Sequence, residues 1–272
     1  MPPTFDTLLE IHRQHSYGWP FETFDVFLTG TNDLSPEGLA RKLTAHRGGW
    51  CFELNEWLAL TLEREGFPVR RLMARNVYAP HRPRSHQICL VEVEGELWTA
   101  DAGFGAQTPR EPMKLQDGYE RVQDGLPFRT IAVPAEAGPL GEPQAWVVES
   151  RHQGAWKGLY RFTLETASPA DFQVGNHFHL TSPASTFPDA RVATKPVPGG
   201  RKTLADHVLK TYRTGPDGEV LTAEETVGSL TAYGKVLEEQ FGIVLSGPAL
   251  DRLWNLEPSV SRGNTPLITK DS

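Results

Sequence analysis

The sequence predicts an α+β fold, with helices in its first part and antiparallel strands in its second. Apolar residues recur at helical spacing as far as about residue 65, and short apolar runs separated by Gly, Pro and Asp follow them. With 272 residues, of which 39% are hydrophobic, the chain is long enough to bury a substantial core in two or three compact units.

Three helices are expected in the first part of the chain. Residues 5–15 have their apolar side chains on one face and therefore predict an amphipathic helix. A second helix is expected from Ser35, a favourable N-cap, to about His46. The third begins at Cys51 and stops at Gly66, which makes the first part of the chain a helical unit.

The pattern changes from helical to extended at Val69. Short runs rich in β-branched and aromatic residues, bounded by turn residues, are typical of an antiparallel β unit. The expected strands are Val69–Val77, His86–Val93, Glu96–Ala100, Phe128–Val133, Ala145–Glu149 and Trp156–Leu164. The stretch Pro134–Pro143 is rich in Gly and Pro and predicts a surface loop.

The last third of the chain is less regular. Residues 166–200 contain several prolines and are expected to form a connector without long regular elements. Arg201–Val227 fits either a helix or two strands joined by a Gly-Pro-Asp-Gly turn. Leu230–Phe241 predicts a helix that stops at Gly242, and the polar tail after Pro258 is expected to be loose.

The composition argues against several classes of function. A formal net charge of -7 leaves no general basic face, so no nucleic-acid partner is expected. No apolar run approaches the ~20 residues that span a bilayer, and the N-terminus does not resemble a signal peptide. The only cysteines, Cys51 and Cys89, are too few for a disulfide framework. We therefore expect a cytoplasmic protein, in which a free thiol persists.

Three residues predict thiol chemistry. Cys51 follows two glycines at the head of a helix, where free N–H groups and the helix dipole favour an anion such as a thiolate. His86 and Asp101 follow in the chain and are the base and the orienting carboxylate that a nucleophilic thiol needs. Together they form a candidate catalytic triad.

Strand pairing predicts that His86 and Asp101 lie on one face of a hairpin. If Glu94 and Gly95 form a two-residue loop, His86 is opposite Gly103 and Asp101 is its diagonal neighbour. Diagonal neighbours lie ~7–8 Å apart at Cα, which is within reach of a carboxylate–imidazole hydrogen bond. A three-residue loop would place the two side chains on opposite faces.

Each of these residues also has a purely structural interpretation. A cysteine at a helix start is more often a buried small residue than a nucleophile, and Cys89, between two apolar residues of a strand, fits that case. His86 alone is explained as a histidine at a strand end, and Asp101 alone as a turn residue. The combination of all three with compatible pairing favours the triad.

Other polar patterns are weaker. His177 and His179 form an H-x-H pair without an evident third ligand, so no metal site is expected. Gly103-Phe104-Gly105 lacks the remaining features of a phosphate loop and predicts a tight turn. Gly199-Gly200-Arg201-Lys202 predicts a turn with a solvated basic flank, with contact to a ligand phosphate as the alternative.

At the triad residues the chain resembles the arylamine N-acetyltransferases. The family's marks are an Arg-Gly-Gly-aromatic-Cys block, a histidine after Thr or Ser, and an Asp-Val-Gly-Phe-Gly block. They correspond here to Arg47–Cys51, Ser85-His86 and Asp101–Gly105. Further matches, which extend the resemblance over roughly residues 4–256, are Pro20-Phe21-Glu22, Tyr160–Leu164, Asp171-Phe172, Asn176, Ser185–Phe187 and Phe241–Ile243.

The resemblance implies a multidomain core similar to that of transglutaminases and papain-like cysteine proteinases. It implies a helical domain over residues 1–68 with the nucleophile and an antiparallel β-barrel domain over 69–165 with the other two triad residues. An interdomain connector over 166–200 and an α/β lid domain over 201–272, with a loose C-terminal tail, complete the expected organisation.

The resemblance also implies roles for individual residues. Cys51, His86 and Asp101 would be catalytic. Phe104 and Gly105 would line the acceptor and acyl site, and Ser85 and Phe187 would lie near the thiol arm of coenzyme A.

Glu22 and Arg47 resemble a buried structural ion pair of the family. Two positions depart from the family pattern: Thr23 replaces the usual Asn, and Ala102 replaces the usual Val. The smaller Ala102 is expected to widen the pocket.

The implied activity is ping-pong transfer of an acetyl group from acetyl-coenzyme A to an arylamine, arylhydrazine or arylhydroxylamine through an acetyl-cysteine. Acetyl-coenzyme A would be a co-substrate, and no permanently bound cofactor is expected. The nearest alternative is a related acyl or amide synthase that uses a malonyl, propionyl or carrier-protein-bound donor. More distant alternatives are a transglutaminase or cysteine-peptidase-like hydrolase and a catalytically silent binding module.

Overall fold

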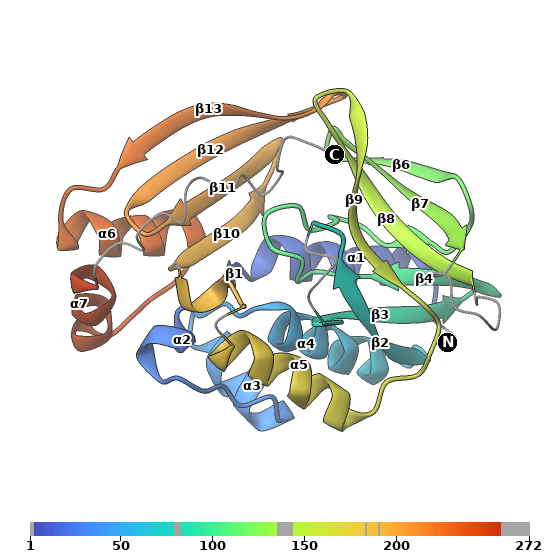
Figure 1. Cartoon of the computed structure of the whole chain (residues 1–272), viewed down its shortest axis with the longest axis horizontal. Coiled ribbons are helices and arrows are strands. Elements are labelled where there is room, and N and C mark those ends of the chain that lie inside the picture. Colours follow the sequence, from blue (N-terminus) through green and yellow to red (C-terminus); the bar gives the residue numbers. More distant parts are fainter. Residues whose placement is uncertain (1–2, 79–82, 135–143, 183, 190, 257–272) are drawn as a thin grey trace.

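The computed structural model of the chain describes residues 3–78, 83–134, 144–182, 184–189 and 191–256. The loop expected at Pro134–Pro143 lies outside these residues except for Pro134, and so does the tail after Pro258. A helical layer lies below a curved sheet and a second, flatter sheet (Figure 1). None of the helices in the described ranges has the length and apolar character needed to cross a membrane.

The three helices predicted in the first part of the chain are confirmed. They are α1 (Phe5–Gly18), α3 (Pro36–Thr44) and α4 (Cys51–Arg64), and Ser35 caps α3 as expected. The sequence analysis missed the short helix α2 (Asp25–Leu28) and the two-residue strand β1 (Phe21–Glu22), which are too short to produce a periodic pattern.

An eight-stranded antiparallel sheet follows, in the order β5-β4-β3-β2-β9-β8-β7-β6. The Gln123 amide nitrogen in β6 lies 3.0 Å from the Met113 sulfur in β5, so the two edges of the sheet meet and form a nearly closed barrel. All six predicted strands are present, and the short strands β5 and β6 are additional. The strands are β2 (Val69–Asn76), β3 (His86–Val93), β4 (Glu96–Ala100), β5 (Met113–Lys114), β6 (Tyr119–Gln123), β7 (Leu126–Pro134), β8 (Gln144–His152) and β9 (Ala155–Phe162).

The β3–β4 hairpin has the predicted register. Val93 pairs with Glu96, and Cys89 pairs with Ala100. Glu94 and Gly95 form the two-residue loop with φ angles of 55° and 76°, as a type I′ turn requires. This loop length places the two ends of the hairpin, which carry the candidate base and carboxylate, side by side.

The expectation of a connector without long elements at 166–200 is wrong. The segment contains helix α5 (Pro169–Thr181), the short 3₁₀ turn η1 (Phe187–Asp189) and strand β10 (Val192–Val197). Pro169 stands in the first turn of α5, where its missing N–H costs no helical hydrogen bond. Pro196 lies beyond the two residues of β10 that pair with β1. These two prolines therefore occupy positions that regular structure tolerates.

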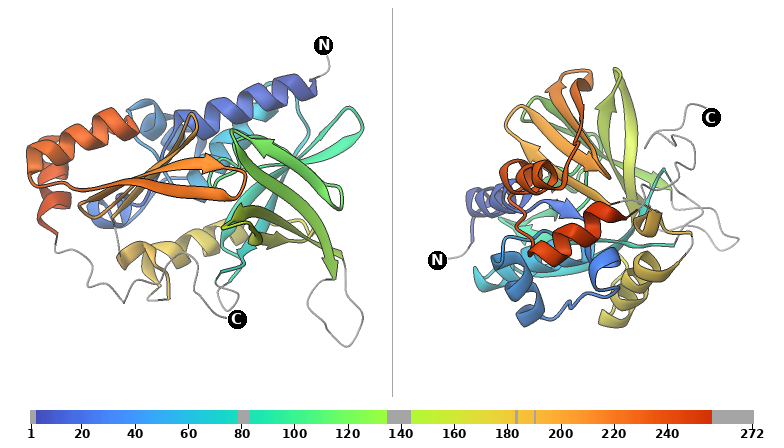
Figure 2. Two further views of the ribbon diagram at one scale, coloured as in Figure 1. Left: turned by 90° about the horizontal axis from the view of Figure 1, so that it is seen from above. Right: turned by 90° about the vertical axis from the view of Figure 1, so that its left-hand side faces the viewer.

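A five-stranded sheet, in the order β1-β10-β11-β12-β13, forms the rest of the molecule and lies beside the barrel (Figure 2). Of the two interpretations of residues 201–227, strands are correct, with the Gly-Pro-Asp-Gly turn between the last two. The helix predicted over Leu230–Phe241 is confirmed and ends at Gly242, which has a φ of 73°, whereas the helix that follows it at Gly247–Asn255 was not predicted. The elements are β11 (Gly200–Ala205), β12 (Val208–Gly215), β13 (Gly218–Thr226), α6 (Leu230–Val236), its π-helical continuation η2 (Leu237–Phe241) and α7 (Gly247–Asn255).

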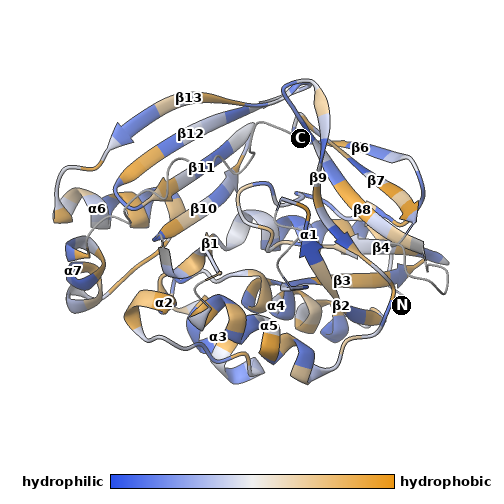
Figure 3. Ribbon diagram, in the orientation of Figure 1, coloured by the Kyte–Doolittle hydropathy of each residue, from blue (hydrophilic) through white to orange (hydrophobic). Residues whose placement is uncertain are grey.

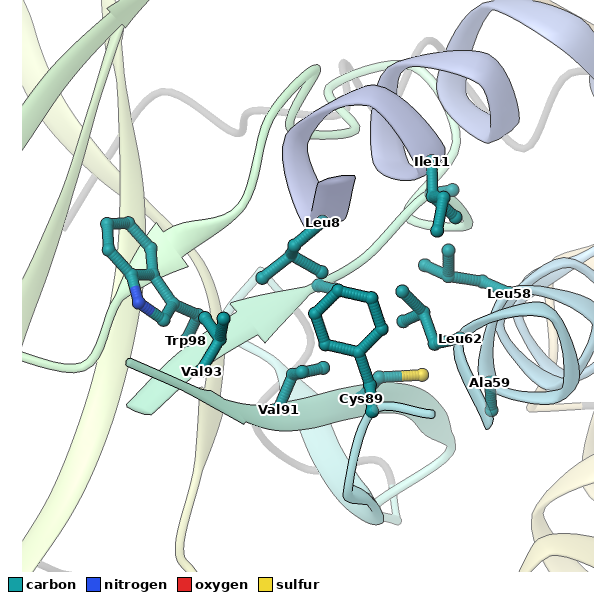
Figure 4. Packing of buried hydrophobic residues seen from close by; sticks show 12 residues of the cluster. Leu8, Ile11, Leu58, Ala59, Leu62, Cys89, Val91, Val93 and Trp98 are labelled. Atoms are coloured by element: carbon teal, nitrogen blue, oxygen red, sulfur yellow. The ribbon is translucent and has the colours of Figure 1, made fainter. Parts of the chain in front are cut away.

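The core that fixes the nucleophile helix lies between α1, α4 and the β3–β4 hairpin. Leu8 of α1, Leu58 and Leu62 of α4 and Val91 of β3 are buried in one cluster (Figure 4). Bands of hydrophobic and hydrophilic residues follow one another along the strands of both sheets (Figure 3), as expected for sheets with one face toward a core. Burial of these apolar faces holds the start of α4 against the start of β3.

Candidate active site

Cys51 is the first residue of α4 and is almost fully buried. The backbone N–H of Trp50 donates to the Glu53 carboxylate at 3.1 Å, which closes the first turn of the helix. The ammonium of Lys42 lies 2.6 Å from the other oxygen of Glu53 and fixes this carboxylate. The thiol is therefore held at a rigid helix N-terminus, where an anion is favoured.

The structure brings Cys51, His86 and Asp101 together. The Nε2 atom of His86 lies 2.7 Å from Oδ2 of Asp101, and Cys51 hydrogen-bonds to the same imidazole. Burial alone would lower the pKa of His86, but the charge of Asp101, the hydrogen bond to it and the contact with Cys51 raise it to about 10. The site thus favours an imidazolium, the partner that stabilises a thiolate.

The Asp101 carboxylate is held in its charged form. Its Oδ1 atom accepts from the Asn55 amide at 2.8 Å and from the Gly103 N–H at 2.9 Å. Burial opposes the charge, but the His86 charge and these hydrogen bonds keep the pKa of Asp101 below its usual value. A carboxylate at this place fixes the proton of the imidazole on Nε2.

Asn55 is one of the residues of this site that the sequence analysis missed; His12, described below, is another. Its amide nitrogen also donates to the Gln87 carbonyl at 2.6 Å, and its amide oxygen accepts from the Ala102 N–H at 2.8 Å. One side chain thus ties the Cys51 helix to both strands that carry the rest of the triad. The available signal was its position four residues after Cys51, which places both side chains on one helix face.

A second histidine lies behind the carboxylate. The N–H of Asp101 donates to Nε2 of His12 in α1 at 3.0 Å. Burial lowers the pKa of His12 to about 4, so its imidazole is neutral and accepts this hydrogen bond. The backbone of Asp101 is therefore fixed as well as its side chain.

The close approach of the Asp101 loop to α4 depends on Gly103. A Cβ atom at this position would lie 2.9 Å from the Cys51 Cα and 3.0 Å from the Asn55 amide nitrogen. Only a residue without a side chain lets the loop and the helix pack at this distance.

Two of the four residues expected near the substrates, Phe104 and Ser85, contact the triad directly. The Phe104 ring meets the His86 ring edge to face at 5.0 Å, and the Ser85 carbonyl lies 3.7 Å from the Cys51 sulfur. Gly105 packs against the ring of Phe21, which in turn contacts Phe187 at 5.7 Å. Phe21 and Phe187 pack against the buried cluster that contains Cys51.

The Glu22–Arg47 pair exists and belongs to a larger buried network. The Arg47 guanidinium donates to Glu22 at 2.6 Å and to Asp25 at 2.7 Å. Lys42 joins Asp25 at 2.7 Å and, through Glu53, the start of α4. Removal of one partner would leave an uncompensated buried charge, which costs about 3–5 kcal/mol.

The remaining polar patterns have structural explanations. His177 is exposed, whereas His179 is buried and binds the Ser85 carbonyl, so the two do not form a ligand pair. The solvated basic flank expected at Arg201-Lys202 is wrong for Arg201, which is buried in β11, binds Glu219 at 2.6 Å and lies over the ring of Tyr212. Within the described ranges, no group of three or more His, Cys, Asp and Glu side chains could hold a metal ion.

The geometry supports covalent chemistry at sulfur. A thiol at a helix start, an imidazole beside it and a carboxylate behind the imidazole are the parts of a nucleophilic triad. Cys51 is the first helical residue, so its N–H has no partner within the helix and is available to an oxyanion.

Comparison with known proteins agrees with this geometry. A family model described as "N-acetyltransferase" matches residues 4–250. The arylamine N-acetyltransferase / N-hydroxyarylamine O-acetyltransferase of Salmonella typhimurium is 32% identical over 246 residues, which cover 89% of this chain and 83% of the relative.

Solved structures have the same fold. The arylamine N-acetyltransferase from Salmonella typhimurium superposes with a TM-score of 0.82 at 29% identity, covering 93% of this chain and 92% of its own. The arylamine N-acetyltransferase of Mycobacterium marinum in complex with CoA superposes with a TM-score of 0.79 at 28% identity, covering 93% of each chain.

Proposed function

Since the chain belongs to the arylamine N-acetyltransferase family, we propose that it transfers an acetyl group from acetyl-coenzyme A to an aromatic amine, hydrazine or hydroxylamine. The transfer proceeds through an acetyl group bound to Cys51. The single observation that carries these roles is the chain of contacts from the Cys51 thiol through His86 to Asp101, with 2.7 Å between imidazole and carboxylate.

In the first half-reaction the Cys51 thiolate attacks the thioester carbonyl of acetyl-coenzyme A. The new carbon–sulfur bond forms, the bond to the coenzyme A sulfur breaks, and the leaving thiolate takes the proton of the His86 imidazolium. The N–H of Cys51 stabilises the oxyanion of the tetrahedral intermediate. His86 is left neutral beside the acetylated sulfur.

In the second half-reaction the acceptor nitrogen attacks the acetyl carbon. Neutral His86 takes the proton that the nitrogen loses, and the Cys51 thiolate leaves. The thiolate–imidazolium pair is thereby restored. Asp101 stabilises the imidazolium and keeps its Nε2 proton on the carboxylate side.

The side chains around the thiol suit an aromatic acceptor. The Phe104 ring packs against His86, and the Phe187 ring packs with Phe21 against the cluster that contains Cys51. We propose that Phe104 and Gly105 line the acceptor and acyl site. Flat rings of this kind pack against an aromatic amine at offset or edge-to-face geometry. We propose that Ser85 and Phe187 also contact the thiol arm of coenzyme A. A cytoplasmic location belongs to the same proposal, because the thiol must remain reduced.

The decisive experiment is intact mass spectrometry after mixing with acetyl-coenzyme A and no acceptor. We expect a gain of one acetyl group that is absent in Cys51→Ala, present in the matched variant Cys89→Ala, and discharged when an arylamine such as 4-aminobenzoate is added. No gain in the wild-type protein would contradict acetyl transfer. Malonyl-, propionyl- and acetyl-coenzyme A in competition would show which acyl group the site prefers.

A further inference from the structure

His179 lies on the buried face of α5 and contacts the Ser85 carbonyl oxygen, which also lies near the Cys51 sulfur. Its ring stacks on Phe187 with 4.2 Å between ring centres and an interplanar angle of 15°. The ring of Phe52, the residue after the nucleophile, lies 6.2 Å away. The imidazole is therefore fixed in one orientation by aromatic neighbours.

The proton of this imidazole can be assigned. Nε2 of His179 lies 2.8 Å from the carbonyl oxygen of Ser85, and a carbonyl oxygen only accepts. Nε2 therefore carries a proton and donates it. Nδ1 faces the Ser185 hydroxyl at 3.3 Å, which holds the other side of the ring.

The same carbonyl oxygen also accepts a hydrogen bond from the protonated Cys51 thiol. The Cys51 sulfur lies 3.7 Å from it, so one acceptor serves two donors. Ionisation of Cys51 removes the S–H donor and places a sulfur anion beside an oxygen that carries partial negative charge. The N–H of His179 continues to bind this oxygen and reduces the repulsion.

We propose that His179 is a positioning residue which, by binding the Ser85 carbonyl, holds the peptide before His86 in place and keeps the ionised form of Cys51 accessible. This inference rests on the proposed function, since it concerns the nucleophile of that reaction. Without the imidazole the buried carbonyl would lose its second donor and face the thiolate alone, and a lost donor of this kind corresponds to about a three- to tenfold effect on an equilibrium.

Two substitutions separate the hydrogen bond from the packing. His179→Phe keeps an aromatic ring against Phe187 but has no donor, whereas His179→Gln loses the ring and retains a donor near the position of Nε2. His177→Leu on the exposed face of the same helix is the matched control. The reaction of Cys51 with iodoacetamide is followed from pH 5 to 9 in each variant, and kcat and KM for acetyl-coenzyme A are measured in parallel.

In His179→Phe we expect a pH midpoint of alkylation shifted upward, alkylation at pH 7 about three- to tenfold slower, and a similar fall in kcat with little change in KM. His179→Gln and His177→Leu should stay within about twofold of the wild type. If His179→Phe does not fold, His179→Leu makes the same comparison.

An unchanged alkylation profile in the folded His179→Phe protein would overturn the proposal. So would equal slowing in His179→Gln, because packing and not the hydrogen bond would then be responsible. A wild-type protein that takes no acetyl group would contradict the proposed function, while the alkylation profiles would still decide the role of His179.

Discussion

Two buried regions next to Asp101 each contain a cysteine and a histidine, and the two regions have opposite electrostatic environments. On the catalytic side Cys51 contacts His86, whose pKa is raised to about 10. On the core side Cys89 and His12 are equally buried, but burial raises the pKa of the Cys89 thiol far above its usual value and lowers that of His12 to about 4. The catalytic region therefore favours charged side chains, whereas Cys89 and His12 in the core are neutral.

Asp101 accounts for the difference through the group that it presents to each side. Its carboxylate faces His86 and stabilises a cation there, whereas its backbone N–H faces His12 and needs a neutral acceptor. Asn55 likewise contacts both regions through different groups. Its side-chain amide binds Asp101, and its backbone carbonyl accepts from the Cys89 thiol at 3.3 Å. Burial alone disfavours the charged thiolate. An imidazolium that is stabilised by a carboxylate favours the thiolate again.

The largest effect should come from Asp101→Asn, which removes the charge and keeps the shape. In this variant the amide oxygen must occupy the position of Oδ1, because that position accepts hydrogen bonds from Asn55 and Gly103. The amide nitrogen must therefore face His86. His86 would then accept at Nε2 and carry its proton on the ring nitrogen beside Cys51, where it cannot take another. We expect acetyl transfer to fall on the order of 10³- to 10⁴-fold, measured as kcat/KM with an arylamine.

This prediction requires that the Asp101→Asn protein folds as the wild type does. Circular dichroism and the urea midpoint should resemble those of the wild type, and alkylation of Cys51 should slow toward the rate of Cys89. Retention of more than about a tenth of the activity would show that the carboxylate is not what distinguishes the two regions.

The second prediction concerns the two thiols directly. At pH 7 stoichiometric iodoacetamide should label Cys51 at least about a hundredfold faster than Cys89, and prior acetyl-coenzyme A should protect Cys51. The imidazolium of His86, which keeps its proton up to about pH 10, lies beside the Cys51 sulfur at this pH and favours its thiolate.

Peptide mapping after alkylation measures this ratio, with N-acetylcysteine as the free-thiol reference. Equal labelling of both cysteines would mean that the thiolate–imidazolium pair does not form.

Short-range patterns predicted one part of this arrangement and could not predict the other. The loop Glu94-Gly95 fixes the register of the hairpin, so the neighbourhood of His86 and Asp101 follows from turn chemistry and a period of two. The start of α4 at Cys51 likewise follows from local apolar spacing. These elements are determined by residues that are close in the chain.

Asn55 and His179 belong to the other part. Asn55 meets Asp101 across 46 positions, and His179 meets Ser85 across 94, so no local pattern identifies either contact. The helix that carries His179 was itself overlooked, because prolines indicate breaks and Pro169 instead occupies a favourable first turn. Packing between distant segments decides these positions.

The third prediction concerns the neutral, buried histidines and the dependence of the free energy of unfolding on pH. His12 and His15 of α1 both have their pKa lowered to about 4 by burial, against about 6.5 in the unfolded chain. Between these pH values only the unfolded state binds the proton, so stability falls as the pH falls from 6.5 to 4, by about 3 kcal/mol for each residue.

His15 is the residue to change, since it does not touch Asp101. Urea unfolding of His15→Gln should show an acid loss about 3 kcal/mol smaller than that of the wild type, while the exposed His177→Gln should keep the full loss. The same acid loss in both variants would contradict a neutral, buried His15.

The smallest effect is expected from Cys89→Ala. Cys89 packs with Leu58, Ala59 and Val91 and makes one weak hydrogen bond, so its removal leaves a small apolar gap (Figure 4) and costs about 1 kcal/mol in unfolding free energy. Acetyl transfer should stay within about twofold, because Asn55 and Asp101 keep all their bonds on the catalytic side. A loss of activity beyond about fivefold at full folding would mean that the two regions are coupled through Asn55 and that the core thiol contributes to the placement of the triad.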